Sequence, residues 1–251
     1  MTRPLAIVIG IGPGLGQALV RKFASDGFAV AFTGRRADSV AAHEAAMRAE
    51  GLEVAGFACD AGRPDQMDAA HARIVERYGA AEVLVYNAAV IEPARFVTRS
   101  GLSEAQYGGA AGWAARGEPA SPDYLMNTFR TNVAGAHHAA LRVSPAMIAA
   151  GRGTILLTGG VLAFGPWIEW GVTSLGKAAL RSLGHSLFKE LSPHGIHVST
   201  IAIHGTMEAG TPYDHHLVAQ AYLDLHRAPK EAWSPDHHFK ADEQGEEDPD
   251  A

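Results

Sequence analysis

The stretch LAIVIGIGPGLG, residues 5–16, joins a short apolar run to glycines at positions 10, 14 and 16. The run has the length of a buried strand, and the residues from Gly14 onward have the apolar spacing of a helix. Glycine in such a turn permits unusual backbone angles and close approach of the main chain to a pyrophosphate. The helix start adds free N–H groups and a positive dipole end. We therefore predict a dinucleotide site at Gly10, Gly14, Leu15 and Gly16, rather than a turn without a ligand.

The rest of the chain repeats the alternation of strand and helix. Apolar runs predict strands at 28–34, 52–60, 81–89, 153–159 and 196–203, and helical spacing predicts helices at 14–27, 38–50, 64–78, 123–150, 173–191 and about 215–227. Strands that alternate with helices of this length form a parallel sheet. Uninterrupted apolar strands are covered on both faces. The predicted fold is α/β, with one domain over residues 1–240 and a doubly wound parallel sheet flanked by helices on both faces.

Residues 97–123 interrupt this alternation with a long insertion loop rich in glycine and alanine. Long connections in compact domains are typically lids, binding loops or disordered segments. A lid or interface and an inert insertion are both open interpretations. Tyr107 and Trp113 are candidates for closing over a substrate.

Charge is concentrated at the C-terminal end of the chain. The net charge of the protein is −6, and residues 241–251 contain six acids and no base, so the body is close to neutral. We predict an acidic disordered tail at 241–251. The lack of a basic stripe disfavours nucleic acid, and the lack of an apolar run of about twenty residues disfavours a membrane span. A single cysteine, Cys59, fits a reducing compartment, so we expect a cytoplasmic location.

The end of the second predicted strand, FTGRRAD at 32–38, indicates the choice of cofactor. In dinucleotide folds an acid at this place binds the ribose 2′-hydroxyl, whereas arginine suits a 2′-phosphate. The chain has Arg35 and Arg36 there and no acid before Asp38. The planar guanidinium matches phosphate geometry. We therefore predict NADP(H) in preference to NAD(H); two solvated arginines are the alternative.

Several motifs together resemble the short-chain dehydrogenase/reductase family over residues 4–206. They are the glycine turn, CD at 59–60, YNAA at 86–89, Asn132 in RTNVAG, ILLTG at 155–159 and Lys177. The resemblance implies a single-domain Rossmann fold. It also implies that Asp60 brackets the adenine, that Asn87 and Ala88 lie beside the adenosine ribose, and that Lys177 holds the nicotinamide ribose. Thr206 and Thr211 are candidates for binding the carboxamide or a phosphate.

The same resemblance implies a degenerate active site. The family uses a Ser–Tyr–Lys–Asn group, of which Lys177 and Asn132 are present. The tyrosine position holds Thr173 and the serine position holds Gly160. A positioned general acid contributes about 10²–10⁴-fold to a rate, and an oxyanion donor contributes about 10²–10³-fold. The rate of ordinary carbonyl reduction is therefore expected to be low, while the ability to bind the cofactor is expected to be kept.

Three nearby side chains are candidates to replace the missing groups. Glu169, between Trp167 and Trp170, is a possible acid if an apolar pocket raises its pKa; the alternative is an exposed loop glutamate. His204 either titrates near neutrality or is structural. Tyr213 is a further candidate for closing over a substrate. The aromatic residues here favour an apolar or aromatic small-molecule substrate.

The sequence also gives predictions about metal binding and about assembly. The adjacent histidine pairs 137–138, 215–216 and 237–238 point apart on a helix, so we predict no metal site. Helices 133–150 and 173–191 are rich in small residues, and by the family resemblance we expect a homodimer or homotetramer.

Two functions remain open from the sequence. The first is an NADP(H)-dependent oxidoreductase that transfers hydride between a carbonyl and an alcohol with an altered proton relay. The second is a non-redox, NADP(H)-binding pseudoenzyme or sensor on the same fold. A lyase or dehalogenase is a third possibility, although such enzymes usually keep the serine and tyrosine.

Overall fold

The computed structural model describes residues 3–102 and 117–240, and its centre is one parallel sheet. The strands form in the order β3-β2-β1-β4-β5-β6-β7. They are β1 (Leu5–Ile9), β2 (Ala29–Gly34), β3 (Val54–Ala58), β4 (Ala81–Tyr86), β5 (Gly153–Thr158), β6 (Ile196–Ile203) and β7 (Asp236–Phe239). The first six are mostly buried apolar runs, which is the composition of strands covered on both faces.

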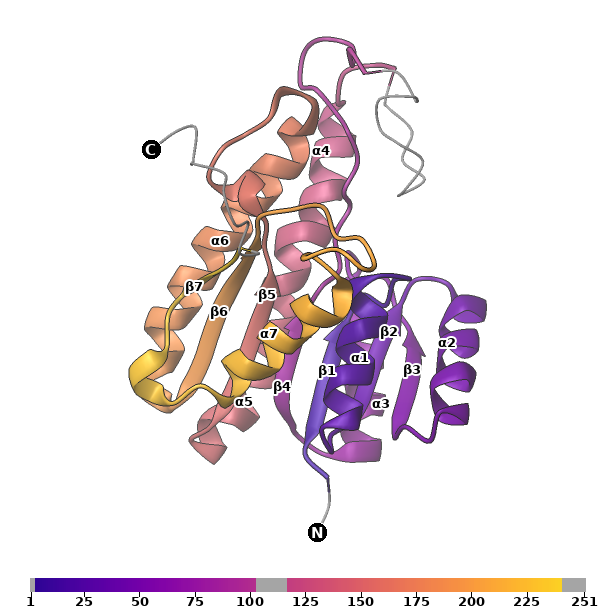
Figure 1. Ribbon diagram of the computed structural model, residues 1–251, viewed down its shortest axis with the longest axis vertical. Helices are drawn as coiled ribbons and strands as arrows, with labels where there is room; N and C mark the ends of the chain where they lie inside the picture. Colours follow the sequence, from indigo (N-terminus) through magenta and orange to yellow (C-terminus); the bar gives the residue numbers. More distant parts are fainter. Residues whose placement is uncertain (1–2, 103–116, 241–251) are drawn as a thin grey trace.

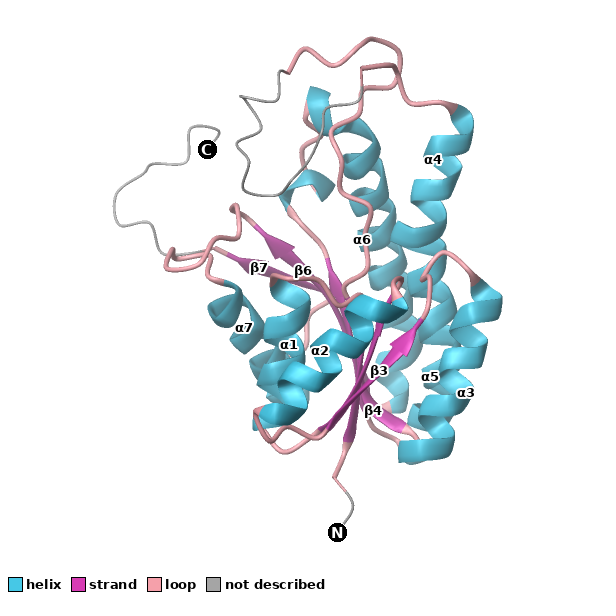
Figure 2. Cartoon of the chain, turned by 90° about the vertical axis from the view of Figure 1, so that its right-hand side faces the viewer, coloured by secondary structure: helices cyan, strands magenta, loops and turns pink. Residues whose placement is uncertain are grey.

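Two layers of helices cover the sheet, as Figure 2 shows edge-on. One apolar cluster joins the sheet to α1 (Leu15–Ser25), α2 (Ala37–Ala49) and α7 (His215–Arg227). The other joins it to α3 (Pro64–Tyr78), α5 (Gly135–Ala150) and α6 (Gly171–Leu191). The predicted doubly wound α/β fold is therefore confirmed.

Two elements differ from the sequence prediction. The helix expected over 123–150 is divided into α4 (Pro122–Phe129), a π-helical turn (Arg130–Ala134) and α5. Strand β7 was not predicted, because DHHF is short and lacks an apolar run. It forms by parallel pairing with β6, in the register Thr200 to Asp236 and Ile203 to Phe239.

Parts of two predicted features lie outside the described residues. These are the tail 241–251 and residues 103–116 of the insertion loop, including Tyr107 and Trp113. Where the loop is described, its two ends meet, because the Ala120 N–H donates to the Arg95 carbonyl at 2.9 Å. None of the described helices combines the length and hydropathy that crossing a bilayer requires.

The sheet topology indicates where a ligand binds. All strands are parallel, but the order in which the chain adds them reverses at β1: β2 and β3 follow on one side of β1, and β4 pairs with β1 on the other side. In open α/β sheets, ligands bind outside the carboxyl ends of the strands at such a switch point. The glycine turn lies at this place, between β1 and α1, at the upper end of the indigo strand in Figure 1.

Candidate cofactor cleft and active site

A cleft of about 260 Å³ opens at the carboxyl ends of strands β1 to β4. Four segments at the ends of these strands supply most of its walls, and Thr131 of the π-helical turn adds to them. The lining residues are Gly10, Ile11, Gly12, Thr33, Gly34, Arg35, Cys59, Asp60, Ala61, Asn87, Ala88, Ala89, Val90 and Thr131. The cleft therefore brings together the glycine turn, the end of β2 and the predicted adenosine-binding residues.

The glycine turn is packed so tightly that side chains are excluded at two positions. Gly10 has a φ of +100°, and a Cβ there would lie 2.5 Å from the Ala88 nitrogen. A Cβ on Gly16 would lie 2.6 Å from the Gly10 oxygen. Gly12, in contrast, faces open space. The Leu15 side chain is buried in the core, so only its backbone can face a ligand.

The two arginines after β2 have different positions. Both are exposed, but only Arg35 is among the residues that line the cleft. Asp60 also lines it, and its Oδ1 accepts a hydrogen bond from the Gly62 N–H at 2.9 Å. Arg35 is therefore the better placed of the two arginines to meet a ligand phosphate.

A chain of hydrogen bonds connects α7 to the glycine turn of the cleft. The Tyr222 hydroxyl on α7 donates to Thr158 Oγ1 at 2.8 Å, and Thr158 Oγ1 donates to Asn87 Oδ1 at 3.1 Å. Asn87 Nδ2 then donates to the Gly10 carbonyl at 2.9 Å. This network fixes the Asn87 amide, so it holds the glycine turn against β4.

Lys177 lies on the same network, within the buried face of α6. Its Nζ donates to the Thr158 carbonyl at 2.7 Å, which is its one partner among the described residues. Burial lowers the pKa of Lys177 from 10.5 to about 8. The ammonium group therefore retains donor capacity for a ligand, and it is far easier to deprotonate than an exposed lysine.

Asn132 lies within the π-helical turn, a distortion that is frequent at functional sites. Its Oδ1 accepts from the Val90 N–H at 2.7 Å, and its Nδ2 donates to the Val90 carbonyl at 3.0 Å. The amide thus pins the segment that follows β4 along the cleft. Gly176 on α6 packs against it, since a Cβ there would lie 3.1 Å from Asn132 Nδ2.

Thr173 and Gly160, which occupy the predicted tyrosine and serine positions, have contrasting surroundings. Thr173 is 1% exposed, and its hydroxyl lies 3.4 Å from the Glu92 carbonyl, to which it donates. The segment after β4 therefore covers the threonine. At Gly160 a Cβ would meet only Lys177 Cε, at 4.0 Å. Space for a side chain exists at 160 but not at 173.

The structure corrects the prediction for Glu169. Its carboxylate is held by Arg95 Nε at 2.7 Å, by the Ser100 hydroxyl at 2.7 Å and by the Gly101 N–H at 3.1 Å. The Arg95 hydrogen bond is the main cause of a pKa below the ordinary range of glutamate. Glu169 is thus ionised at neutral pH, which contradicts the interpretation with a raised pKa, and its burial contradicts the alternative of an exposed loop glutamate. It anchors the start of the insertion loop to the short turn Ile168–Trp170 that precedes α6.

Replacing Glu169 with glutamine should lower the free energy of unfolding at pH 7 by about 1–3 kcal/mol, because it removes a charged acceptor and leaves Arg95 partly unpaired. Because the folded pKa is lowered, this stabilisation is present above the unfolded value of about 4.5 and is lost as pH falls through the folded value. Denaturant unfolding at pH 7 and pH 3.5 measures both effects. The control is Glu118→Gln, whose exposed pair with Arg99 should contribute little; equal losses in the two variants would contradict the anchor role.

The structure places His204 beside β7 and Tyr213 against the loop that follows β6. His204 Nε2 lies 2.8 Å from His238 Nδ1 of β7, and burial followed by the nearby His238 lowers the pKa of His204 below its ordinary value. Of the two interpretations left open, the lowered pKa favours a structural histidine. The Tyr213 ring lies against Gly205, where a Cβ would be 2.4 Å from the ring.

The two threonines predicted to bind a carboxamide or phosphate lie in the loop between β6 and α7. Thr206 is exposed and Thr211 donates to the Glu208 carbonyl at 2.8 Å. Neither is among the residues that line the cleft. Their ligand roles stay predictions.

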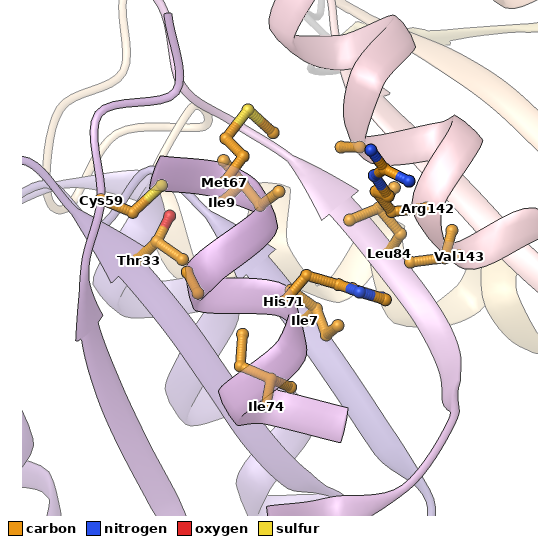
Figure 3. A pocket seen from close by; sticks show the side chains of 12 residues that line it. Ile7, Ile9, Thr33, Cys59, Met67, His71, Ile74, Leu84, Arg142 and Val143 are labelled. Carbon is orange, nitrogen blue, oxygen red and sulfur yellow. The ribbon is translucent and has the colours of Figure 1, made fainter. Parts of the chain in front are cut away.

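Cys59 lies between the cleft and a second, smaller space. Figure 3 shows this apolar cavity of about 20 Å³, with Cys59, Met67 and Ile74 on one side and Leu84 and Val143 on the other. Burial raises the pKa of the Cys59 thiol to about 11. The cavity is too small and too apolar for a polar substrate, and we assign it to core packing.

Native Cys59 should react with a thiol reagent at pH 8 about 100-fold more slowly than the unfolded chain, because two pKa units remove that much thiolate. The comparison is the labelling rate in buffer and in strong denaturant. Since Cys59 also lines the cleft, labelling with bound NADPH is a second measurement. Native and unfolded rates within tenfold of each other would contradict the buried placement.

Comparison with known proteins agrees with this architecture. Residues 4–217 match the family described as short chain dehydrogenase. The chain is 30% identical over 200 residues to the short-chain reductase protein NovJ of Streptomyces niveus, covering 79% of this chain and 67% of that protein. It is 27% identical over 198 residues to "Dehydrogenase/reductase SDR family member 4" of Sus scrofa, covering 79% of this chain and 64% of that protein.

Solved structures give the same fold. A metagenomic short-chain oxidoreductase in complex with NADP superimposes with a TM-score of 0.77 at 24% identity, covering 95% of this chain and 97% of that one. The fold and cleft define a protein of the dinucleotide-binding α/β class. The chain belongs to the short-chain dehydrogenase family, a family of oxidoreductases.

Some residues around the site were not found from the sequence. Thr158 and Tyr222 hold the buried network, and Arg95 holds Glu169. The Tyr124 hydroxyl on α4 donates to Glu92 Oε2 at 2.9 Å, close to the covered Thr173. These residues carry no local motif, because their partners are distant in sequence. Among these residues only Thr158, within ILLTG, belongs to one of the motifs on which the family resemblance rests.

Proposed function

We propose that this protein is an NADP(H)-dependent oxidoreductase whose proton relay differs from that of its family. The observation that carries the proposal is the buried Lys177, held on the Thr158 carbonyl beside an intact glycine turn. Burying an ammonium group lowers the stability of the fold, and a hydrogen bond from it to a ligand would explain why it is present. A structural neighbour that binds NADP supports the choice of cofactor.

The described residues fit a nicotinamide dinucleotide. Gly12 faces open space at the turn, and the exposed Arg35 lines the cleft together with Asp60. Arg35 would hold the 2′-phosphate, Asn87 and Ala88 would lie beside the ribose, and Lys177 would hold the nicotinamide ribose. When bound, the cofactor supplies the hydride. Lys177, with its lowered pKa, is the group best able to move a proton near neutral pH.

The alternative is an NADP(H)-binding protein without redox chemistry, acting as a sensor. Two observations favour it: Thr173 is covered by the Glu92 backbone, and Glu169 is fixed by Arg95 in its ionised form. Neither can supply a proton to a carbonyl without a rearrangement. A degenerate active site is compatible with both the oxidoreductase and the sensor, so it does not distinguish between them.

Cofactor turnover separates the two functions. The purified protein is first titrated with NADPH by calorimetry, and NADPH absorbance is then followed with a panel of apolar and aromatic aldehydes and ketones. Carbonyl-dependent loss of absorbance supports the oxidoreductase. Tight NADPH binding with unchanged absorbance for every carbonyl supports the sensor. A chain that binds neither NADPH nor NADH would refute both.

Replacing Arg35 with serine should weaken NADPH binding by about 10–100-fold, the loss expected for charge-assisted hydrogen bonds to a phosphate. NADH affinity should stay unchanged, because NADH lacks the 2′-phosphate. The matched control is Arg36→Ser, since Arg36 does not line the cleft. Parallel calorimetric titrations give the three affinities. Wild-type protein that binds NADH as tightly as NADPH would rule out the proposed preference.

Exposed apolar side chains support two further proposals. Phe164, Trp167 and Ile168, before α6, are 44%, 59% and 70% exposed, which suits an apolar or aromatic substrate. Leu141 and Ile148 of α5 and Leu175 of α6 are also exposed, which suits a homo-oligomer formed through these helices. A monomeric mass in solution would contradict the second proposal.

A further inference from the structure

His215, the first residue of α7, lies against the phosphate-binding turn although it is 201 positions from Gly14 in the sequence. A Cβ on Gly14 would lie 2.5 Å from His215 Nε2. The imidazole is half-buried, and it has no hydrogen bond or ion pair with any residue that the structure describes. A side chain with no partner among the described residues thus faces a turn whose sequence and conformation suit an anion.

The arrangement of the helices concentrates positive potential at this point. Helices α1 and α7 pack side by side, as Figure 1 shows in indigo and orange; α1 begins at the glycine turn, and α7 begins beside it, at His215. The positive ends of two helix dipoles therefore lie together. The nearest carboxylate in the sequence is Asp214, and it is engaged, accepting from the His216 N–H at 2.8 Å and the Gly210 N–H at 2.7 Å.

We propose that His215 is a ligand-binding residue that donates a hydrogen bond to the pyrophosphate of the dinucleotide. This inference rests on the proposed NADP(H) binding. The pyrophosphate is the negatively charged group that a glycine turn at a helix start accepts. An imidazole N–H that approaches the turn from the second helix adds a side-chain donor to the backbone N–H groups of the turn.

Two sets of residues would contact different parts of the cofactor, one the adenosine and the other the pyrophosphate. Arg35, Asp60 and Asn87 lie at the adenosine end of the described cleft, whereas His215 reaches Gly14, beyond its lining. A ligand that contains the adenosine and 2′-phosphate but no pyrophosphate should therefore not depend on His215. Adenosine 2′-monophosphate (2′-AMP) is such a ligand, and it separates the two contributions.

The test is calorimetric titration of wild-type protein, His215→Ala and His215→Gln with NADPH and with 2′-AMP. His215→Ala should bind NADPH about 10-fold or more weakly, as for loss of a hydrogen bond to a charged group, and should bind 2′-AMP as the wild type does. His215→Gln, which keeps an N–H donor, should recover part of the NADPH affinity. His216→Ala is the matched control, because its exposed side chain lies next in sequence and should change neither affinity.

The outcomes distinguish this inference from the proposed function. NADPH affinity that is unchanged or tighter in His215→Ala, while wild type binds both ligands, overturns the role of His215 and leaves the cofactor assignment intact. Equal losses for NADPH and 2′-AMP also overturn it, because they indicate general damage to the fold. Wild-type protein that binds neither ligand overturns the proposed function, and this inference with it.

Discussion

Replacing Lys177 with methionine should abolish carbonyl-dependent NADPH oxidation and at the same time stabilise the folded protein at pH 7. The proposed relay uses the ammonium group, and methionine has a similar length without a proton to move. The stability effect has the opposite sign because the lysine is buried. Its pKa falls from 10.5 to about 8 through desolvation, so the charged form is disfavoured in the folded state.

The size of the stability gain follows from linkage. A shift of this size corresponds to roughly 3 kcal/mol, and loss of the hydrogen bond to the Thr158 carbonyl returns about 1 kcal/mol, so we expect a net gain of about 2 kcal/mol. Between pH 8 and pH 10.5 the unfolded chain binds more protons at this lysine than the folded chain does. Wild-type stability should therefore rise across this window, and the advantage of the variant should shrink.

Denaturant unfolding at pH 7 and pH 10, with turnover measured on the same preparations, checks both parts. The matched control is Lys189→Met, because Lys189 is exposed on the same helix and should alter neither stability nor turnover. Unchanged turnover in Lys177→Met would refute the proposed relay. A destabilised variant with the same pH dependence as the wild type would contradict the buried, desolvated lysine.

The fold could be predicted because its signals are local. Each of the first six strands is an apolar run bounded by turn residues, and the glycine turn specifies how β1 joins α1. Strand β7 has no such signal, because its residues become a strand only through pairing with β6. The π-helical turn at Arg130–Ala134 was likewise missed, since the residues on both sides have ordinary helical spacing.

The candidate site was predicted unevenly for the same reason. The cofactor half depends on backbone turns that glycine makes visible, and the structure gathers Gly10, Arg35, Asp60 and Asn87 around one cleft. The catalytic half depends on partners that are distant in sequence. Arg95, 74 positions from Glu169, lowers the pKa that an apolar pocket would have raised. The direction of the Glu169 pKa shift therefore could not be predicted without knowing its neighbours in space.

Restoring both family residues, with Gly160→Ser and Thr173→Tyr, should raise the rate of NADPH-dependent reduction of para-nitrobenzaldehyde by about 10²-fold or more, since a positioned general acid alone contributes that much. The two positions differ in how they accept a side chain. A Cβ at Gly160 meets only Lys177 Cε at 4.0 Å, so the serine should fit without loss of stability. Gly159→Ser is its control, because a Cβ there would lie 2.8 Å from the Ile201 oxygen and should destabilise the sheet.

The tyrosine is harder to accommodate than the serine, and its effect tests whether the site lacks only a proton donor. Thr173 is 1% exposed beneath the Glu92 carbonyl, so a phenol must displace the segment after β4, at a cost of about 1–3 kcal/mol for overpacking. A folded double variant that binds NADPH and gains rate would show that the scaffold still supports the family reaction and lacks only its proton donor. A folded variant that binds NADPH at wild-type affinity without any gain would contradict the mapping of the active site onto Thr173, and would favour a function in which the covered cleft binds the cofactor without turning it over.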